Sequence, residues 1–223
     1  MELLDTDADS TNPDPDDWIY EKVNEFKYLG VCINTKNDWS QEIGLRIIKA
    51  GKASFALSKF FKSKMLSKKT KVRLYTVIVR AILTYGCEAW TTTSVTERRL
   101  TTFENRIWRM ICGPKLDANT GMWRRKFNKE LIAETEMTPI KYHIRGQRIQ
   151  WFGHIMRGSD MKIIKTVMSW KPTGKRPRGR PRKRWMDVVE EDLKRIGVND
   201  WRNIIHDREK WREVVMAAKT LVE

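Results

Sequence analysis

The sequence predicts a mainly α-helical protein with one short β-hairpin near its N-terminus. Two observations predict this fold class. From Ser40 onward, apolar residues recur at intervals of three and four, which is typical of amphipathic helices. Before Ser40, two short runs rich in β-branched and aromatic residues flank Gly30 in "WIYEKVNEFKYLGVCINTKNDW", a pattern typical of two paired strands.

The N-terminal part divides into an acidic leader and the predicted hairpin. Residues 1–17 are acidic, lack aromatic side chains and contain two prolines, so we expect them to be disordered. The hairpin is expected over residues 18–36, and "NTKND" at its end has the composition of a turn.

Residues 37–113 are expected to form a bundle of three helices. The first begins at Ser40 and is predicted to run for roughly 24 residues. Its apolar stripe consists of Ile43, Ile47, Ala50, Leu57 and Phe60. Ser67 can cap the second helix. The apolar face of that helix consists of Leu74, Val77, Ile78, Ala81, Ile82 and Tyr85. The third begins at "SVTE" (Ser94 to Glu97), which has capping-box spacing, and ends at Gly113. Its inward residues are Leu100, Phe103, Ile107 and Ile111.

A further helix is expected within residues 114–170, where Thr138 can cap it and Pro139 can occupy its first position. One face carries Ile140, Ile144, Trp151 and Ile155. Lys141, Arg145 and Arg148 lie on the neighbouring face at helical spacing, so they are a candidate phosphate-binding ridge. The alternative is an ordinary solvated face.

Residues 171–184 are predicted to be an extended linker, because they are rich in Pro and Gly and poor in apolar residues. Residues 185–223 return to helical spacing in three short segments. The expected caps are Gly197, Asn199 and Asp207, and the apolar residues are Trp185, Val188, Val189, Leu193, Ile196, Trp201, Ile204, Ile205, Trp211, Val214, Val215 and Ala218.

The charge is strongly positive and unevenly distributed. The chain has 223 residues and a formal net charge of +16. Because the first 21 residues hold eight acids and no Lys or Arg, the remainder carries +24. Such a body attracts polyanions, and RNA or DNA, bound through phosphates, is the expected partner. An anionic membrane surface is the second candidate partner, although no apolar stretch is long enough to span a membrane. Three widely spaced cysteines fit free thiols in the nucleus or cytosol, with the nucleus favoured.

Five stretches occur in an order that resembles a known family. They are "FKYLGVCIN", "YGCEAW", "RIQWFGHIMR", "GRPRKRWMDVVEEDL" and "DREKWREVV". Together they resemble the C-terminal part of the reverse transcriptase of LINE-type (non-LTR) retrotransposons, particularly the RTE-like clade, from about Val23 to Val215. The resemblance implies that Tyr28, Leu29 and Gly30 belong to a primer-grip-like hairpin at the end of the palm. It also implies that residues 37–113 form a thumb-like helical bundle, followed by the C-terminal extension.

The same resemblance implies that this chain is not an enzyme by itself. Polymerases of this family hold two Mg²⁺ ions with aspartates on strands. The only adjacent aspartates here are Asp16 and Asp17 in "NPDPDDW", where prolines preclude a central strand. No catalytic residue is therefore assigned, and a catalytic reverse transcriptase supplied in trans is a possible partner. His143, His154 and His206 lack a cysteine at ligand spacing, so neither a metal site nor a cofactor is expected.

The linker carries the strongest binding signal. The candidate nucleic-acid-binding residues in it are Lys171, Lys175, Arg176, Arg178, Gly179, Arg180, Pro181, Arg182, Lys183 and Arg184. Its "RGRP" core resembles the AT-hook of chromatin proteins, in which glycine permits deep entry into a narrow minor groove. The same cations can instead bind phosphates without reading bases, act as a nuclear import signal, or form a solvated linker.

Three hypotheses follow for the whole chain. The first is a noncatalytic nucleic-acid-binding fragment of a reverse transcriptase. The second is a host-recruited nuclear DNA-binding or chromatin protein that uses the AT-hook-like segment. The third is a decayed element copy without function. Tryptophans beside basic residues could stack on bases, but Trp185, Trp201 and Trp211 lie on apolar stripes and are expected in the core, as is His154.

Overall fold

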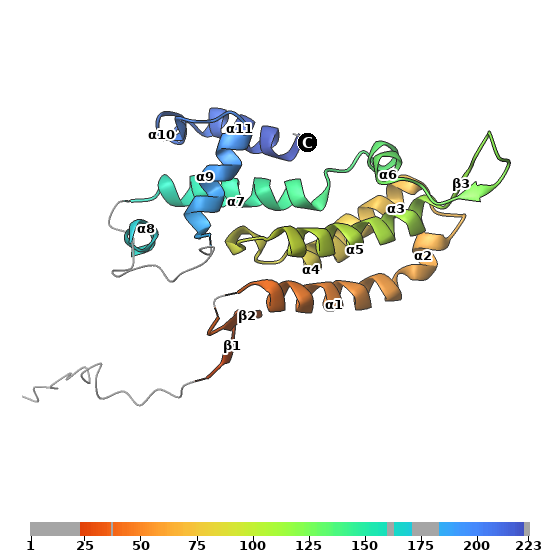
Figure 1. The fold of residues 1–223 in the computed structure, drawn as a ribbon, viewed down its shortest axis with the longest axis horizontal. Helices are drawn as coiled ribbons and strands as arrows, with labels where there is room; N and C mark the ends of the chain where they lie inside the picture. The colour runs from red at the N-terminus through yellow and green to blue at the C-terminus, as the bar shows by residue number, and fades with distance from the viewer. Residues whose placement is uncertain (1–22, 37, 160–162, 171–182, 221–223) are drawn as a thin grey trace, which may run out of the picture. The chain divides into compact units, whose positions relative to one another are not determined.

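The protein is mainly α-helical, as predicted, with a short antiparallel hairpin near its N-terminus (Figure 1). The structure, a computed structural model, describes residues 23–36, 38–159, 163–170 and 183–220. The acidic leader, the first residues of the predicted hairpin and most of the basic linker lie outside the described residues. The chain separates into two units, residues 1–38 and 39–223. Within the described residues, no helix is both long and apolar enough to cross a membrane.

The described part of the first unit is the hairpin. Strand β1 (Glu25–Tyr28) pairs with β2 (Val31–Asn34), and Tyr28 lies opposite Val31. The turn therefore consists of Leu29 and Gly30, both with positive φ (46° and 81°). A two-residue turn with two positive φ angles matches the right-handed twist of the strands, and glycine adopts this conformation without strain.

The second unit begins with a helical bundle. Its elements are α1 (Ser40–Ala56), α2 (Ser58–Lys62), α3 (Lys68–Leu74), the π-helix η2 (Tyr75–Arg80), α4 (Ala81–Leu83), the 3₁₀ turn η3 (Cys87–Ala89) and α5 (Ser94–Cys112). Helix α1 contacts α4 and α5. Ser67 caps α3 as predicted, accepting a hydrogen bond from the Thr70 N–H at 3.1 Å. The capping box of α5 lies one residue earlier than predicted, on Thr93 and Thr96.

Two predicted apolar faces in this bundle are wrong in detail. The first predicted helix breaks at Leu57, and Phe61 is buried while Phe60 is exposed. Phe61 lies 18 residues after the buried Ile43, which is five whole helical turns, so the core-facing stripe passes through Phe61 and not through Phe60. In the second, Tyr75, Val79 and Leu83 face the core, whereas Val77 and Ile78 are exposed. A π-helical segment has more residues per turn than an α-helix, so the periodicity of 3.6 assigns the wrong face there.

A stretch that carried no clear signal follows α5. Strands β3 (Lys115–Leu116) and β4 (Trp123–Arg124) form a second hairpin, and α6 (Asn128–Thr135) packs on α5. Glu130 ties these elements together, since its carboxylate accepts hydrogen bonds from Arg124, Lys115 and the Phe127 N–H. The pattern of residues in this stretch predicted neither this hairpin nor α6.

The remaining helices are α7 (Ile140–Met156), α8 (Ile163–Ser169), α9 (Trp185–Arg195), α10 (Trp201–Ile204) and α11 (Arg208–Thr220). Asp207 caps α11 as predicted, because its Oδ1 accepts the N–H groups of Glu209 and Lys210 at 3.0 and 3.1 Å. Trp201 and Trp211 are buried, which confirms their assignment to the core.

Helix α7 connects two hydrophobic cores. Ile140 and Ile144, in its first half, join the core of α1, η2, α4 and α5. Ile149 and Phe152, in its second half, join a core formed with α9, α10 and α11. In Figure 1, α7 accordingly lies between α5 on one side and α11 on the other. The geometry of α7 therefore decides how the C-terminal helices are placed on the bundle.

Candidate nucleic-acid interface

The predicted basic linker is described only at its end. Lys171, Lys175, Arg176, Arg178, Gly179, Arg180, Pro181 and Arg182 lie outside the described residues. Lys183 is exposed and forms an ion pair with Glu191. Arg184 is the N-cap residue of α9, and its N–H donates to Asp187 Oδ2 at 3.0 Å. The linker residues thus remain candidates from sequence alone.

The predicted phosphate-binding ridge on α7 is wrong for two of its three members. The Arg148 side chain is only 3% exposed, and its Nε and Nη2 donate to Asp192 Oδ2 at 2.9 and 2.7 Å. Its Nη1 donates to the Trp90 carbonyl at 2.7 Å. The buried Arg145 lies 3.3 Å from Asp192 Oδ1 through its Nε. Lys141 is half-buried, with its ammonium 4.4 Å from the centre of the Tyr142 ring.

Asp192 explains this difference. It lies on α9, 44 residues after Arg148, and only the tertiary fold brings it against α7. A buried guanidinium needs such a partner, because desolvation of an uncompensated charge is costly. Spacing along α7 could not reveal it. These arginines connect α7 to α9 and to the Trp90 carbonyl. They are therefore not available to bind a phosphate.

A concave surface lies between α7 and α11. It is lined by basic residues that are far apart in the sequence and were not predicted to form one site. It encloses about 600 Å³. Its basic members are Arg157, at the end of α7, and Arg208, Arg212 and Lys219 of α11. We call this surface the α7–α11 groove. Gln150, His154, Gly158, Trp211, Val215 and Met216 complete its lining.

Among the described residues that line the groove, none is acidic. Arg208, Arg212 and Lys219 are spaced four and seven residues apart, which places them on one face of α11. Glu209 and Glu213 follow Arg208 and Arg212 by one residue each, so they lie about 100° further around the helix. Burial lowers the pKa of Arg157, and the nearby Arg208 lowers it further. An anion bound between the two guanidinium groups would relieve this mutual repulsion.

An exposed aromatic pair adjoins the groove. The rings of Trp151 and His154 are stacked, with centres 5.3 Å apart and planes 22° from parallel. Trp151 is 40% exposed, and His154 is exposed as well. The expectation that His154 is a core residue is therefore wrong, and Trp151 is not buried with the other residues of the apolar face on which its spacing placed it. Apolar neighbours in "FGHIM" suggested burial, but Phe152, Gly153 and Ile155 are the buried members of that turn.

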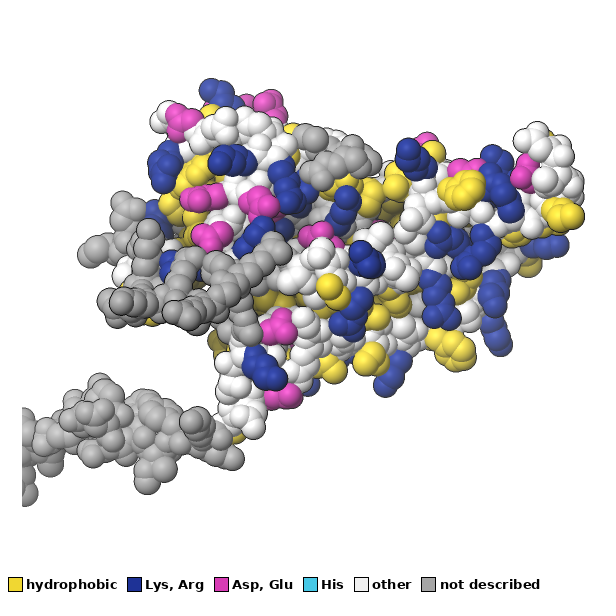
Figure 2. Space-filling view, viewed as in Figure 1, with side chains coloured by type: hydrophobic (Ala, Val, Ile, Leu, Met, Phe, Trp, Pro, Cys, Tyr) yellow, Lys and Arg dark blue, Asp and Glu magenta, His cyan; other side chains and the backbone are white. Residues whose placement is uncertain are grey.

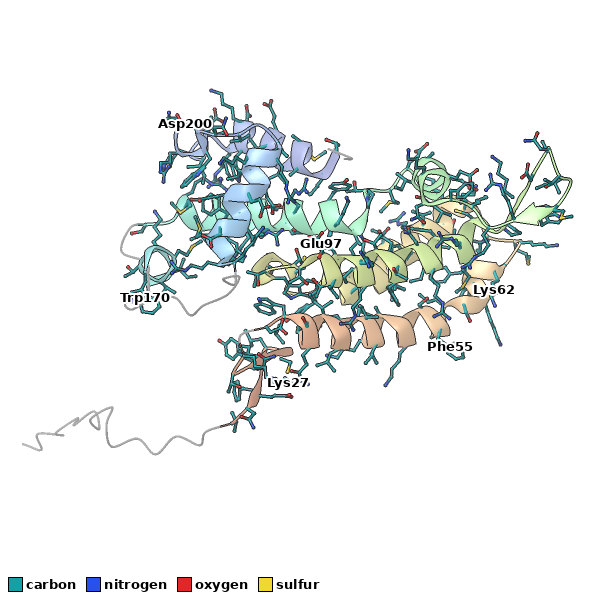
Figure 3. All side chains as sticks on the ribbon, viewed as in Figure 1. Lys27, Phe55, Lys62, Glu97, Trp170 and Asp200 are labelled. Carbon is teal, nitrogen blue, oxygen red and sulfur yellow. The ribbon has the colours of Figure 1, made fainter. Side chains whose placement is uncertain are left out.

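Other basic side chains gather near α2, α3 and the second hairpin, where Figure 2 shows many Lys and Arg side chains on one face. Lys62, at the end of α2 (Figure 3), and the neighbouring Lys64 and Lys69 are exposed. Two other lysines of this region are less available to a ligand, because Lys71 is buried and Lys68 forms an ion pair with Glu134. Part of this region is concave, because Arg109, Arg125, Lys126, Phe127 and Asn128 line a second pocket of about 470 Å³. Two of its three cations already interact within the protein, since Arg109 donates to Asn128 and Lys126 pairs with Glu134.

The primer-grip-like residues lie at the tip of the first hairpin. Tyr28 is 58% exposed and Leu29 is more exposed still, so both side chains are accessible. Their role in contacting a primer stays a prediction. Among the described residues, no three His, Cys, Asp or Glu side chains are grouped so that they could hold a metal ion. Burial raises the pKa of Cys87 to about 12, so this thiol is poorly suited to act as a nucleophile.

The comparisons with known proteins point to a mobile element. The chain is 29% identical over 203 residues to a Caenorhabditis elegans protein whose name describes it as uncharacterized and transposon-derived. The match covers 87% of this chain and 71% of that protein. This similarity supports a transposon origin. No protein-family model matches the chain, and no solved structure matches it.

Proposed function

We propose that this chain is a noncatalytic nucleic-acid-binding protein derived from the C-terminal part of a non-LTR retrotransposon reverse transcriptase. The observation that carries this proposal is the α7–α11 groove, which presents four cations and, in the described part of the chain, no lining carboxylate. The transposon-derived relative and the ordered series of motifs support the origin. The charge of +24 beyond residue 21 supports a polyanionic ligand.

The groove binds the backbone of the ligand rather than its sequence. Guanidinium groups match phosphate oxygens in geometry and charge, and the counterions released from the nucleic acid drive association. Each phosphate contact contributes about 0.7 to the slope of log K against log salt on a single strand and about 0.9 on a duplex. If all four groove cations bind phosphates, they contribute a slope of about −3 on a single strand and about −3.6 on a duplex.

The test compares two charge-removing variants on the same helix. Arg212→Gln removes a cation that lines the groove. Lys210→Gln removes an exposed cation that lies about 160° around α11 from Arg212 and pairs with Asp207 instead. We expect Arg212→Gln to weaken RNA or DNA binding and to reduce the magnitude of the salt slope by about one contact's share. Lys210→Gln should leave both nearly unchanged.

Two results would overturn the proposal. One is an absence of nucleic-acid binding by the full chain at low salt. The other is an affinity that does not respond to salt concentration. Equal effects of the two substitutions would leave nucleic-acid binding intact but remove the groove as its site.

The AT-hook-like segment favours a second candidate function. Residues Arg178 to Pro181 read "RGRP" with basic residues on both sides, as in a minor-groove reader of a host-recruited nuclear protein. Such a protein binds A·T-rich duplexes more tightly than G·C-rich ones of equal length. Equal affinities for the two duplexes would indicate that the segment contacts phosphates without reading bases. A nuclear location and a catalytic reverse transcriptase acting in trans belong to these proposals and need localisation and co-purification experiments.

The decayed element copy is the remaining candidate, and exposed apolar side chains favour it. Phe55, on the outer side of α1 (Figure 3), is 81% exposed, and Ile48 lies two turns before it on the same helix. A chain that has lost its packing partner is expected to unfold in a broad thermal transition. A sharp transition in the full chain would argue against this candidate.

A further inference from the structure

The Trp151–His154 pair gives the groove a second kind of contact besides charge. We propose that the α7–α11 groove binds single-stranded nucleic acid and that an unpaired base stacks on the Trp151 indole. This inference rests on the proposed function, because it assumes that the groove cations bind the backbone. It adds that the ligand is single-stranded and that Trp151 is the residue that recognises an unpaired base.

The positions on α7 place the indole beside the groove rather than inside it. His154 lines the groove, and Trp151 precedes it by three residues. At 100° per residue, Trp151 lies about 60° around α7 from His154. Gln150 and Arg157, which also line the groove, lie on the other side of His154. A strand that crosses α7 from the groove cations therefore meets His154 first and Trp151 next.

The packing of this pair prepares a stacking platform. The imidazole covers part of the indole, with the two planes 22° from parallel, and so restricts its rotation. An indole that is already held in place loses less side-chain entropy when a base stacks on it. Trp151 is nevertheless 40% exposed, whereas Trp108 and Trp211 are almost completely buried. A large exposed aromatic side chain gains little for folding, but it gives a base a surface to stack on.

Strand selectivity follows from the geometry of the ligand. In a duplex, each base is stacked between its neighbours and paired across the helix, so its faces are unavailable to an indole. In a single strand, a base can turn out and stack on an aromatic side chain, which contributes about 1–3 kcal/mol per base. This corresponds to about a five-fold to 150-fold gain in affinity. The groove cations bind phosphates of either ligand.

The experiment measures the affinity of the full chain for three labelled ligands by fluorescence polarisation. They are a single strand of about 12 nucleotides, within the usual site size of single-strand binders, a duplex of equal length, and an abasic single strand. We expect Trp151→Ala to weaken binding of the single strand about five-fold or more. Its affinities for the duplex and the abasic strand should stay as in the wild type.

Two further variants make the test specific. Trp151→Phe keeps an aromatic face and should retain most of the affinity for the single strand. Trp123→Ala removes another exposed tryptophan, 69% exposed on β4, and should change none of the three affinities. Circular dichroism of each variant checks that the helical fold is kept.

The outcomes separate this inference from the proposed function. If Trp151→Ala weakens all three ligands equally or none of them, the stacking inference is overturned, while salt-dependent binding that is lost in Arg212→Gln still supports the proposed function. If the wild type binds no nucleic acid, both fall together. A wild type that binds duplex more tightly than single strand also overturns the inference.

Discussion

Gly153 is a position in α7 at which even a methyl group would collide with a buried aromatic ring. Adding a Cβ there would place it 2.5 Å from Trp211 Cδ1 and 2.7 Å from Cε2, and closer still to the indole nitrogen. Trp211 is buried in the second core, and its Nε1 donates to the Ile149 carbonyl at 3.2 Å. Gly153→Ala must therefore move the indole and break this hydrogen bond.

The expected cost follows from three contributions. Overpacking in a closely packed core costs about 1–3 kcal/mol. A buried indole N–H that loses its acceptor costs about 1–3 kcal/mol more. Alanine regains about 1 kcal/mol over glycine within a helix. We therefore expect Gly153→Ala to lower the free energy of unfolding by about 3 kcal/mol, and the melting temperature by roughly 6–12 °C for a unit of this size.

Gly51→Ala is the matched control. Gly51 also lies inside a helix, α1, but its added Cβ would meet only Phe103 at 3.8 Å, an ordinary contact. That substitution should stabilise the protein by about 0.5–1 kcal/mol. Urea titrations followed by circular dichroism give both values. If Gly153→Ala proves as stable as the wild type, the close crossing of α7 and α11 is refuted. In a Trp211→Phe background, the cost of Gly153→Ala should shrink, because the two sites share one contact.

Three further predictions concern buried polar groups. Asp192→Asn leaves two buried arginines without their carboxylate, so it should lower the free energy of unfolding by about 3–5 kcal/mol; an unchanged urea midpoint would contradict the buried ion pair. Burial lowers the pKa of His143 to about 4, with nearby cations adding to the effect. Because the unfolded chain binds the proton first, near pH 6.5, stability should fall by about 2 kcal/mol as the pH decreases from about 7 to 5. His143→Gln should show a smaller fall, and equal falls would rule out His143 as the cause. Since burial raises the pKa of Cys87 to about 12, thiol reagents should modify it far more slowly in the folded chain than in urea, as mass spectrometry of the labelled peptide can measure.

Local signals in the sequence predicted the helices and several of their ends. Ser67 and Asp207 cap helices, and Gly113 ends α5 with a φ of 67°, because capping depends on residues within one turn of the helix end. The turn at Leu29 and Gly30 likewise follows from adjacent residues. Features of this kind can be predicted from the sequence, because they depend only on residues that are neighbours along the chain.

Features that depend on distant partners could not be predicted. Helical spacing identified Arg145 and Arg148 as neighbours on one face but not that Asp192 would cover that face. The α7–α11 groove joins Arg157 to Arg212, which are 55 positions apart in the sequence. The series of motifs in the sequence did not pair these two segments. Only tertiary packing decides which cations face a ligand and which are enclosed.

Buried polar contacts at two points fix α7 and thereby shape the groove. At its N-terminus, the Ile140 N–H donates to Glu104 Oε2 at 2.8 Å, and the hydroxyl of Tyr75 donates to the other oxygen of the same carboxylate at 2.8 Å. Near its middle, Arg148 fixes α7 to α9 through Asp192. Hydrophobic packing alone is tolerant of rotation, whereas a buried carboxylate with several donors accepts only one arrangement. A cation-rich chain thus uses some of its arginines inside, to hold one helix in register, so that Arg157 at the end of that helix can face the cations of α11 across a groove whose described lining contains no acid.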